Sequence, residues 1–318
     1  MENTTTETVL RVSDYDLAAT LDSGQAFRWH RESPERGQLS RVIWHPAGEP
    51  PALRDRWVGV IGNHWVRLTQ TPDGIHAAAA GPVADWQWLH DYLQTGLDLA
   101  AVLETFPDDA PLRDAVAACR GLRLLRQDPW ECLASFILSS TKQIVQIRQI
   151  VARLCERFGE PVSLCSVEPA ARPDSATGRT LQFAFPSPEK IACLTEADLR
   201  ACKMGFRAPH LLAAARQIAE GRLDLERLRQ LPLEEARAEL IRLRGVGGKI
   251  ADCVLLFAYG FDGAFPVDVW VERALRELYF PRRRVGDQRL RHFAATHFGP
   301  HAGYAQQYLF HYMRTKMK

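Results

Sequence analysis

The sequence predicts an α+β protein in which an N-terminal antiparallel β-sheet domain is followed by a mostly α-helical domain. Two observations predict this fold class. Short segments rich in Val, Ile, Trp and Phe, separated by Pro, Gly and Asn, fill much of residues 1–108. Across residues 109–318, nearly every segment has helical spacing of its apolar residues. We therefore expect a domain boundary near residue 108.

Four segments of the N-terminal part have the composition of β-strands. They are QAFRWHRE (25–32), LSRVIWH (39–45), RWVGVIG (56–62) and HWVRLTQ (64–70). Such β-branched and aromatic side chains favour the half-buried surface of a sheet. At VADWQWLHDYL (83–93) the pattern changes to helical spacing.

Helix-capping signals support the helical assignment of the second part. In DPWECLASFIL (128–138), Asp128 is the expected N-cap and Glu131 stands in the capping-box position. Ser187 and Thr195 begin two further segments of this kind. These signals predict at least three helix starts between residues 128 and 196.

Composition limits the possible functions. The formal net charge of the 318 residues is +2, so any nucleic-acid surface must be local. The seven cysteines form no C-x-x-C pair, which argues against zinc and iron–sulfur sites. No apolar run reaches the roughly 18 residues needed to span a bilayer, and the start MENTTTETVLRV does not resemble a signal peptide. We expect reduced thiols, no metal, no cofactor and no membrane attachment.

A glycine-rich turn lies between two predicted helices. LEEARAELIRL (233–243) is amphipathic, RGVGG follows it, and a second helix runs to about Tyr259 before Gly260. One interpretation is a tight helix–helix turn with a solvated Lys249. However, the pattern L-x-G-V-G resembles the helix–hairpin–helix motif, here at about 233–260, in which hairpin amides hold a DNA phosphate.

The charge near this turn agrees with a DNA contact. Residues 201–249 contain ten Lys and Arg against six Asp and Glu, and PRRRVGDQRLRH (281–292) contains five arginines. A solvated helix face would have the same composition, so this observation supports the DNA interpretation without establishing it.

Lys249, Cys253 and Phe257 are spaced four residues apart and therefore share one face of the second helix. A lysine at the head of an apolar stripe is partly desolvated, which favours the neutral amine that acts as a nucleophile. A cysteine in this position, considered alone, is more often a small core residue.

Asp268 follows Lys249 by nineteen residues, in FPVDVWVERAL (265–275). The simplest role for this aspartate is an N-cap, which contributes about 1 kcal/mol. Its carboxylate would also stabilise positive charge that develops on a reacting sugar. The two roles are compatible, since a capping side chain is held rigidly.

The hairpin, Lys249 and the PVDV segment together resemble the helix–hairpin–helix DNA glycosylases that carry both a lysine and an aspartate. Four further blocks resemble the 8-oxoguanine DNA glycosylase family in its own order along the chain, over residues 10–312. They are SGQAFRW (23–29), RLLRQDPWECLASFILSS (123–140), KMGFRAP (203–209) and FGPHAGYAQQYLF (298–310).

The resemblance implies a reaction and its residues. Lys249 would attack the anomeric carbon of a flipped nucleotide, displace the damaged base and form a Schiff base that permits β-elimination. Asp268 would stabilise the cationic sugar. Gly24 matches the glycine whose carbonyl accepts the N7–H found only in oxidised guanine. Its loss would leave a buried polar group unpaired, at a cost of about 1–3 kcal/mol.

The remaining base-pocket positions also follow from the resemblance. Gln306 matches the glutamine that reads the Watson–Crick edge, while Phe310 and Cys253 match the residues that sandwich the base. Phe257 continues the lysine face and is included with them. Without the resemblance, Phe310 would be assigned to the core and Gln306 to an exposed helix position.

The positions expected to contact DNA match the family only in part. Phe206 matches an aromatic wedge, and Arg207 matches one of the arginines that hold the opposite cytosine. Thr141 stands where the family has an asparagine that fills the vacated space, Gln146 where it has a second arginine, and Trp270 where it often has a histidine near a phosphate. The expected DNA-contacting set is Thr141, Phe206, Arg207, Gly245, Gly247 and Trp270.

The sequence therefore predicts a bifunctional glycosylase that excises 8-oxoguanine from duplex DNA and cleaves the resulting abasic strand. Two alternatives are a monofunctional glycosylase for alkylated bases, against which Lys249 argues, and a non-catalytic helix–hairpin–helix DNA-binding module. We expect a monomer that acts on double-stranded DNA containing oxidised guanine, in the cytoplasm of a bacterium or the nucleus of a eukaryote.

Overall fold

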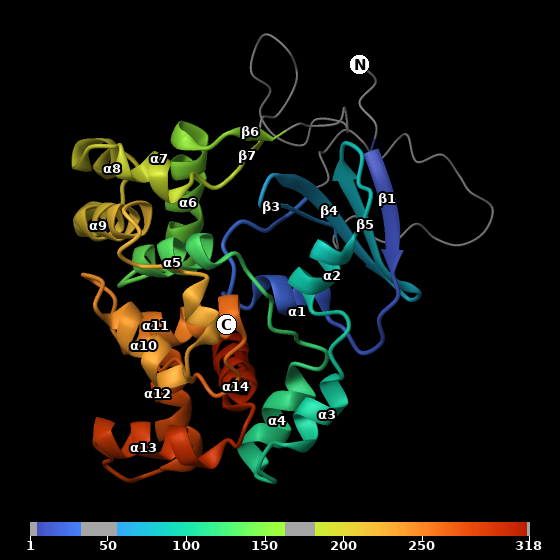
Figure 1. Ribbon diagram of the computed structural model, residues 1–318. Coiled ribbons are helices and arrows are strands. Elements are labelled where there is room, and N and C mark those ends of the chain that lie inside the picture. The colour runs from blue at the N-terminus through green and yellow to red at the C-terminus, as the bar shows by residue number, and fades with distance from the viewer. Residues whose placement is uncertain (1–4, 33–55, 163–181, 317–318) are drawn as a thin grey trace, which may run out of the picture.

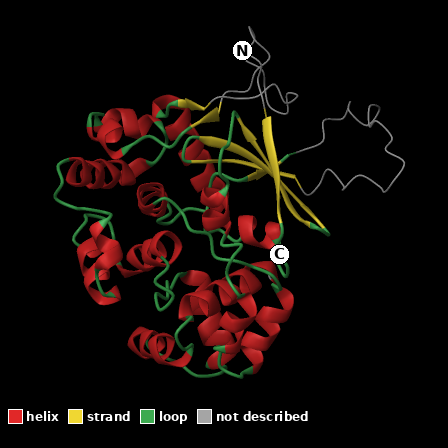
Figure 2. Cartoon of the chain, turned by 45° about the vertical axis from the view of Figure 1, so that its right-hand side comes forward, coloured by secondary structure: helices red, strands yellow, loops and turns green. Residues whose placement is uncertain are grey.

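The computed structural model describes residues 5–32, 56–162 and 182–316, and it confirms the α+β fold class. An antiparallel sheet lies at one corner of the molecule, and helices form the remainder (Figures 1 and 2). In the described ranges, no helix has the length and apolar character that a bilayer crossing requires.

The sheet has five strands in the order β1-β5-β4-β3-β2, and all neighbouring pairs are antiparallel. The strands are β1 (Thr5–Leu10), β2 (His30–Arg31), β3 (Arg56–Ile61), β4 (His64–Thr71) and β5 (Gly74–Ala80). Tight connections between β3, β4 and β5 set their register, with Gly59 opposite Val66 and Val66 opposite Ala79.

The two faces of the sheet are covered by different elements. On one face, Trp57 and Leu68 pack with Leu21 of α1 (Leu17–Asp22) and Leu89 of α2 (Gln87–Leu93). On the other face, a smaller cluster joins Val58, Val60 and Trp65 to Val162 of the short β6 (Pro161–Val162), which pairs with β7 (Gln182–Phe183). Successive residues of β3 thus alternate between two apolar environments, as the period of a strand requires.

Two predicted strands, 56–62 and 64–70, are confirmed as β3 and β4, whereas the prediction for 25–32 is largely wrong. Only His30–Arg31 is a strand there. The chain turns at Gly24, whose φ is 82°, and hydrogen bonds of the buried Gln25 side chain hold the next residues in a loop. The predicted strand 39–45 lies outside the described residues. The sequence patterns did not identify β1 or β5.

The helical part contains several short and a few longer helices. They are α3 (Leu99–Glu104), α4 (Ala110–Ala118), α5 (Pro129–Leu138), α6 (Ile144–Phe158), α7 (Pro188–Ala192), α8 (Glu196–Ala201), α9 (Ala208–Ala219), α10 (Leu233–Ile241), α11 (Gly248–Val254), α12 (Val269–Ala274), α13 (Asp287–His297) and α14 (Ala302–Lys316). Short turns at Gly205–Arg207 and Arg227–Gln230 precede α9 and α10.

The predicted helix starts are confirmed. Asp128, Ser187 and Thr195 each accept a hydrogen bond from a backbone N–H of the first turn. The side chain of Glu131 does not form the expected capping-box bond. It accepts a hydrogen bond from Nη1 of Arg28, at 3.2 Å. That pair ties α5 to the segment that leads into β2.

The hairpin has the predicted form. α10 ends at Ile241, a turn with Gly245 at φ 86° follows, and α11 continues through a π-helical turn, η4 (Leu255–Tyr259), to Gly260. Gly260 closes the helix in the left-handed conformation.

The boundary between the two parts of the chain is crossed by side chains. Leu125 belongs to the core beneath the sheet, and Phe27 belongs to the helical core. The boundary at residue 108 therefore remains a prediction.

Gly121 offers a test of how the two parts are joined. Its φ is 76°, its carbonyl accepts from the Asp16 N–H at 2.8 Å, and an added Cβ would lie 2.7 Å from that nitrogen. Gly62 has a φ of 57° with no described atom within 4 Å of its Cβ position. We expect Gly62→Ala to lose about 1–2 kcal/mol of unfolding free energy from backbone strain alone. Gly121→Ala should lose about 1–3 kcal/mol more, from overpacking.

The measurement is urea unfolding of the wild type and both variants. Equal losses in the two variants would show that Gly121 is not packed against the Asp16 backbone as described.

Candidate active site

Lys249 stands in the first turn of α11, directly behind the hairpin glycines. Its side chain is half-buried, and its Nζ donates to the Ser139 Oγ at 3.4 Å. The same nitrogen lies 5.2 Å from the centre of the Phe136 ring. Both contacts come from α5 and its C-terminal end, so α5 fixes the direction in which the lysine points.

An aromatic stack supports this lysine from below. Phe136 and Phe257 are parallel, with ring centres 5.6 Å apart, and Phe27 meets Phe136 edge-on at 5.5 Å. The Phe257 ring is buried against the Phe136 ring and is therefore screened from solvent. A cation above a ring face is attracted by the ring quadrupole, which favours the observed lysine position.

Asp268 is the N-cap of α12, as expected from the sequence. Its Oδ1 accepts from the backbone N–H of Trp270 at 3.0 Å and of Val271 at 2.9 Å. Burial raises the pKa of this carboxyl above its ordinary value, and the two hydrogen bonds and the Lys249 charge oppose that rise. The cap and the interaction with Lys249 coexist, so neither role excludes the other.

Cys253 lies one turn after Lys249 and is buried. Burial raises the pKa of its thiol to about 12, against the opposing charge of Lys249. The cysteine is therefore a neutral, polarisable surface at neutral pH and not a nucleophile.

The loop that carries Gly24 is held by the side chain of Gln25, which is fully buried. Its amide nitrogen donates to the carbonyl of Thr20, the hydroxyl of Ser23 and the carbonyl of Arg123, at 2.8–3.0 Å. Its amide oxygen accepts from the Leu125 N–H at 2.7 Å. The segment before β2 and the segment before α5 are thereby joined through one side chain.

A side chain at Gly24 would be strained, because its φ is 82° and three neighbouring side chains stand close. A Cβ would lie 2.7 Å from Cδ1 of Ile144, 3.0 Å from Nη1 of Arg314 and 3.4 Å from Cε1 of Phe310. The structure thus brings two predicted pocket residues, Gly24 and Phe310, into contact.

Gln306 lies one turn before Phe310 on α14 and is 4% exposed. Its Oε1 is buried and accepts no hydrogen bond from the described residues. Buried polar atoms are nearly always paired, so this amide oxygen is available to accept a hydrogen bond from a group other than the described residues.

The α5–α6 connection links the lysine to the expected DNA contacts. Thr141, at φ 55°, accepts a hydrogen bond on Oγ1 from Nη2 of Arg207 at 2.6 Å. Arg207 is 2% exposed, and burial lowers the pKa of its guanidinium. Its Cζ lies 4.2 Å from the ring centre of Phe206, whose side chain is 54% exposed. The Phe206 side chain therefore projects into solvent, as a wedge between bases would, whereas the Arg207 side chain is buried in the protein.

The side chain of Gln146 forms a hydrogen bond at the start of its own helix. Its Oε1 accepts from the Gln143 backbone N–H at 3.2 Å, within the capping box of α6. Its amide nitrogen is the group left to meet a partner outside the helix.

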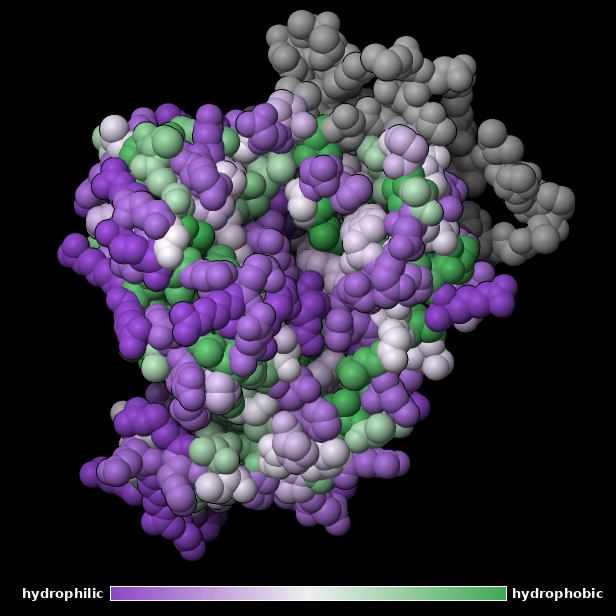
Figure 3. Space-filling model, viewed as in Figure 1, coloured by the Kyte–Doolittle hydropathy of each residue, from purple (hydrophilic) through white to green (hydrophobic). Residues whose placement is uncertain are grey.

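The hairpin surface is exposed at Gly245 and Gly247, and Trp270 is half-buried at the start of α12. His210 of α9 fills the position that a side chain at Gly245 would need, since a Cβ there would lie 2.4 Å from its Nδ1. In the space-filling view, the molecule is hollowed between the helices and the sheet, and the walls of the hollow are largely hydrophilic (Figure 3).

Sequence reasoning missed four residues around this site: Ser139, Phe136, Gln25 and Arg314. The first three stand inside the quoted blocks, where nothing marked them individually. Arg314 had a usable signal, because it follows Gln306 and Phe310 at the four-residue spacing of one helix face. Among the described residues, no group of three or more His, Cys, Asp or Glu is arranged to hold a metal ion.

Comparisons with known proteins cover most of the chain. The family model described as 8-oxoguanine DNA glycosylase, N-terminal domain, matches residues 8–133. The model of the HhH-GPD superfamily base excision DNA repair protein matches residues 134–296.

Individual relatives agree with these matches. A probable N-glycosylase/DNA lyase of Methanothermobacter thermautotrophicus is 32% identical over 230 residues, which cover 66% of this chain and 69% of that protein. The N-glycosylase/DNA lyase OGG1 of Arabidopsis thaliana is 27% identical and covers 94% of this chain and 77% of its own length. The Clostridium acetobutylicum 8-oxoguanine glycosylase/lyase, in complex with dsDNA containing cytosine opposite to 8-oxoG, is 28% identical with a TM-score of 0.80, over 100% of both chains.

The raised pKa of Asp268 has a consequence for stability. Because its folded pKa lies above its ordinary value, ionisation of this carboxyl lowers stability as pH rises through that interval, and the cost persists at neutral pH. Asn can accept the same two backbone hydrogen bonds without a charge. We expect Asp268→Asn to melt at or above the wild-type temperature at pH 7.

The difference in melting temperature between Asp268→Asn and the wild type should disappear at a pH below the ordinary carboxyl pKa. There, Asp268 is protonated in both the folded and the unfolded wild type. Asp128→Asn, at the exposed N-cap of α5, is the matched control and should show no gain at pH 7. A lower melting temperature for Asp268→Asn at pH 7 would mean that the cap requires the charged carboxylate.

Proposed function

The chain belongs to the HhH-GPD superfamily of base excision DNA repair proteins, and we propose that it excises 8-oxoguanine from duplex DNA with Lys249 as the nucleophile. It is a bifunctional enzyme, an N-glycosylase that also cleaves the strand as a lyase. The residue assignment is supported by the half-buried amine of Lys249, which Ser139 and Phe136 orient at the start of α11, and by Asp268, whose carboxylate is fixed at the N-cap of α12.

The Lys249 amine attacks C1′ of the flipped nucleotide. A C1′–N bond forms, the C1′–N9 bond breaks with its electron pair moving onto the base, and the new ammonium gives one proton to the departing base. The sugar ring then opens as the C1′–O4′ bond breaks and O4′ takes a proton from solvent, which leaves an iminium. Loss of a C2′ proton to solvent breaks the C3′–O3′ bond, so the 3′ phosphate departs and the strand is cleaved. The Ser139 hydroxyl and the Phe136 ring orient the amine for this attack.

Asp268 stabilises the cationic sugar in the transition state. Its carboxylate is held by two backbone hydrogen bonds, so no reorganisation is needed when charge develops. Its partial burial strengthens the electrostatic interaction, because solvent screens it less.

Two groups read the edges of the base, and two others hold its faces. The Gly24 carbonyl accepts the N7–H of the oxidised base, and Gln306 Oε1 accepts from the Watson–Crick edge, where 8-oxoguanine has donors. Phe310 and the neutral thiol of Cys253 hold the two faces of the ring, while Phe257 supports the neighbouring wall.

The duplex is held without sequence readout. Backbone amides at Gly245 and Gly247 bind a phosphate, the side chain of Trp270 contacts the DNA backbone, and Phe206 enters the stack. We infer that one copy of the chain suffices for this contact, and that the protein acts wherever the cell keeps its DNA.

Lys249→Gln tests the nucleophile. We expect this variant to lose base excision and borohydride trapping on an 8-oxoguanine duplex, because an amide cannot form a Schiff base. Duplex binding should stay within about threefold of wild type, since the hairpin amides that hold phosphate are unchanged. Single-turnover excision and gel-shift affinity are the measurements, and wild-type excision by the variant would refute the mechanism.

Opposite-base selectivity tests the departures at Thr141 and Gln146. Arg207 is a donor that suits cytosine acceptors, but it must leave the Thr141 hydroxyl to reach a base, and no second arginine is present at position 146. We expect cytosine to be favoured by a smaller margin than two arginines would give. One lost base contact reduces discrimination by roughly 1–3 kcal/mol.

The selectivity is measured as single-turnover excision from four duplexes that differ only in the opposing base. Complete rejection of the three non-cytosine duplexes would show that other residues supply the missing readout.

A further inference from the structure

Arg314 completes the face of α14 that carries two proposed base-pocket residues. Gln306, Phe310 and Arg314 are spaced four residues apart, so their side chains lie along one side of the helix. The side chain of Arg314 is 11% exposed. A guanidinium this deeply buried is rare unless it has a partner or a task.

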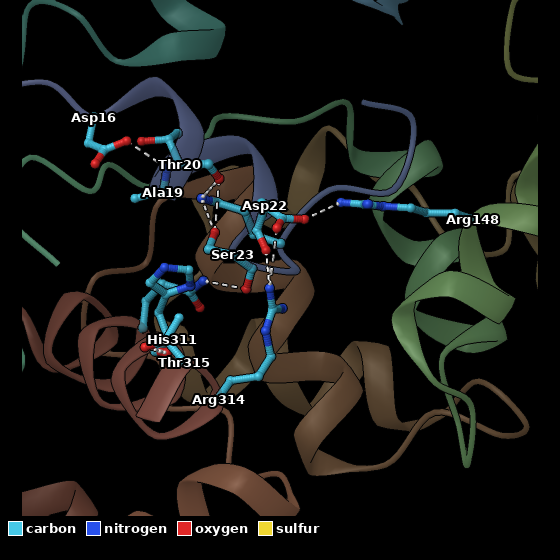
Figure 4. Close-up of polar contacts among 11 residues, drawn as sticks. Asp16, Ala19, Thr20, Asp22, Ser23, Arg148, His311, Arg314 and Thr315 are labelled. Carbon is cyan, nitrogen blue, oxygen red and sulfur yellow. Dashed lines mark hydrogen bonds and ion pairs between the residues drawn. The ribbon is translucent and has the colours of Figure 1, made fainter. Parts of the chain in front are cut away.

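Asp22, at the end of α1, is the acidic neighbour of Arg314, and Arg148 approaches it from α6 (Figure 4). Nη2 of Arg314 donates to the Asp22 carbonyl oxygen and lies 4.0 Å from Oδ2 of its carboxylate. Nη2 of Arg148 donates to Oδ1 of the same carboxylate at 3.0 Å. Two guanidinium groups share one carboxylate, which leaves one positive charge uncompensated within the cluster.

The rest of the Arg314 guanidinium is unused. Both interactions with Asp22 employ Nη2, while Nη1 and Nε are buried and have no hydrogen-bond partner in the described parts of the chain. A purely structural role for Arg314 accounts for Nη2 and leaves these two donors unexplained.

The unused Nη1 lies at the base-recognition loop. It is 3.0 Å from the position that an added Cβ would take at Gly24, and the Cζ of Arg314 is 5.8 Å from the ring centre of Phe310. Gly24 and Phe310 are the residues assigned to the N7 position and to one face of the base, so the free donor stands beside both.

Two unpaired polar groups thus flank Phe310 on α14. Gln306 Oε1 is an acceptor that needs a donor, and Arg314 Nη1 is a donor that needs an acceptor. A planar ligand that satisfies both has N–H groups at one edge and an oxygen at the other. 8-Oxoguanine has this arrangement, with N1–H and the 2-amino group on one edge and carbonyl oxygens on both sides of N7.

We propose that Arg314 donates a hydrogen bond from Nη1 to a carbonyl oxygen of the flipped base beside N7, and that this bond strengthens as the base departs. The inference rests on the proposed function. When the C1′–N9 bond breaks, its electron pair enters the base, and the resulting negative charge is shared by the carbonyl oxygens until the proton from Lys249 neutralises it. A positioned cation at such an oxygen stabilises the transition state more than the ground state.

Arg314→Leu removes the donor and the charge while keeping an apolar filling. We expect single-turnover excision of 8-oxoguanine to slow by about ten- to a hundred-fold, the effect of one charged hydrogen bond. Strand cleavage at a preformed abasic site should change by less than about threefold, because that reaction uses Lys249 with no base in the pocket. A merely structural role would slow both reactions together.

Two further variants sharpen the experiment. Arg148→Gln removes the other guanidinium from Asp22 and should slow excision by less than about threefold, since its side chain is partly exposed and screened. Equal losses in Arg148→Gln and Arg314→Leu would show that only net charge matters and would overturn the direct contact. Arg314→Lys retains the charge with fewer donors and should fall between Arg314→Leu and wild type.

The outcomes separate the two levels of the proposal. A wild-type protein that leaves 8-oxoguanine in place refutes the proposed function itself. A wild type that excises, together with an Arg314→Leu that excises equally fast, overturns only the role of Arg314. If the leucine variant does not fold, the ratio of excision to abasic-site cleavage is measured on Arg314→Lys, and a wild-type ratio there overturns the inference.

Discussion

The buried amide of Gln25 is the constraint on which the rest of the site depends. Its donor and acceptor ends are both satisfied, by Thr20, Ser23 and Arg123 on one side and by Leu125 on the other. A fully satisfied polar network in the interior is rigid, because any displacement leaves a polar group unpaired. The carbonyl of Gly24, one residue before, is thereby fixed relative to the helical core, as its proposed role in recognising a single N–H requires.

The α5 helix and its connection to α6 contact the other parts of the site. Phe136 and Ser139 place the lysine, Thr141 holds Arg207, and Ile144 packs against Gly24. The nine residues 136–144 therefore contact Lys249, Arg207 and the loop that carries Gly24. Movement of Arg207 toward a base would have to break its bond to Thr141, which links events at the opposite strand to the segment that also orients Lys249.

Sequence reasoning identified the features that have a local signature. The hairpin, the N-cap at Asp268 and the stop at Gly260 follow from nearby residues and are all present. The strand predicted at 25–32 failed because the apolar residues of that segment are buried in an irregular loop, which mimics strand composition. β5 was not recognised because GIHAAAA is rich in alanine, a residue that sheets disfavour.

The unpredicted parts of the site are those made by distant pairs. The contact of Arg314 with Asp22 joins positions 292 residues apart, and the Arg207–Thr141 bond joins positions 66 apart. No periodicity encodes such contacts. The proposed readout by the Gly24 carbonyl has a consequence for how substrate range can change. A side chain at position 24 would be strained, because its φ is 82° and a Cβ would lie 2.7 Å from Cδ1 of Ile144. If this carbonyl reads N7–H, the distinction between oxidised and normal guanine rests on the backbone, and changes of substrate range are expected on the side chains of α14.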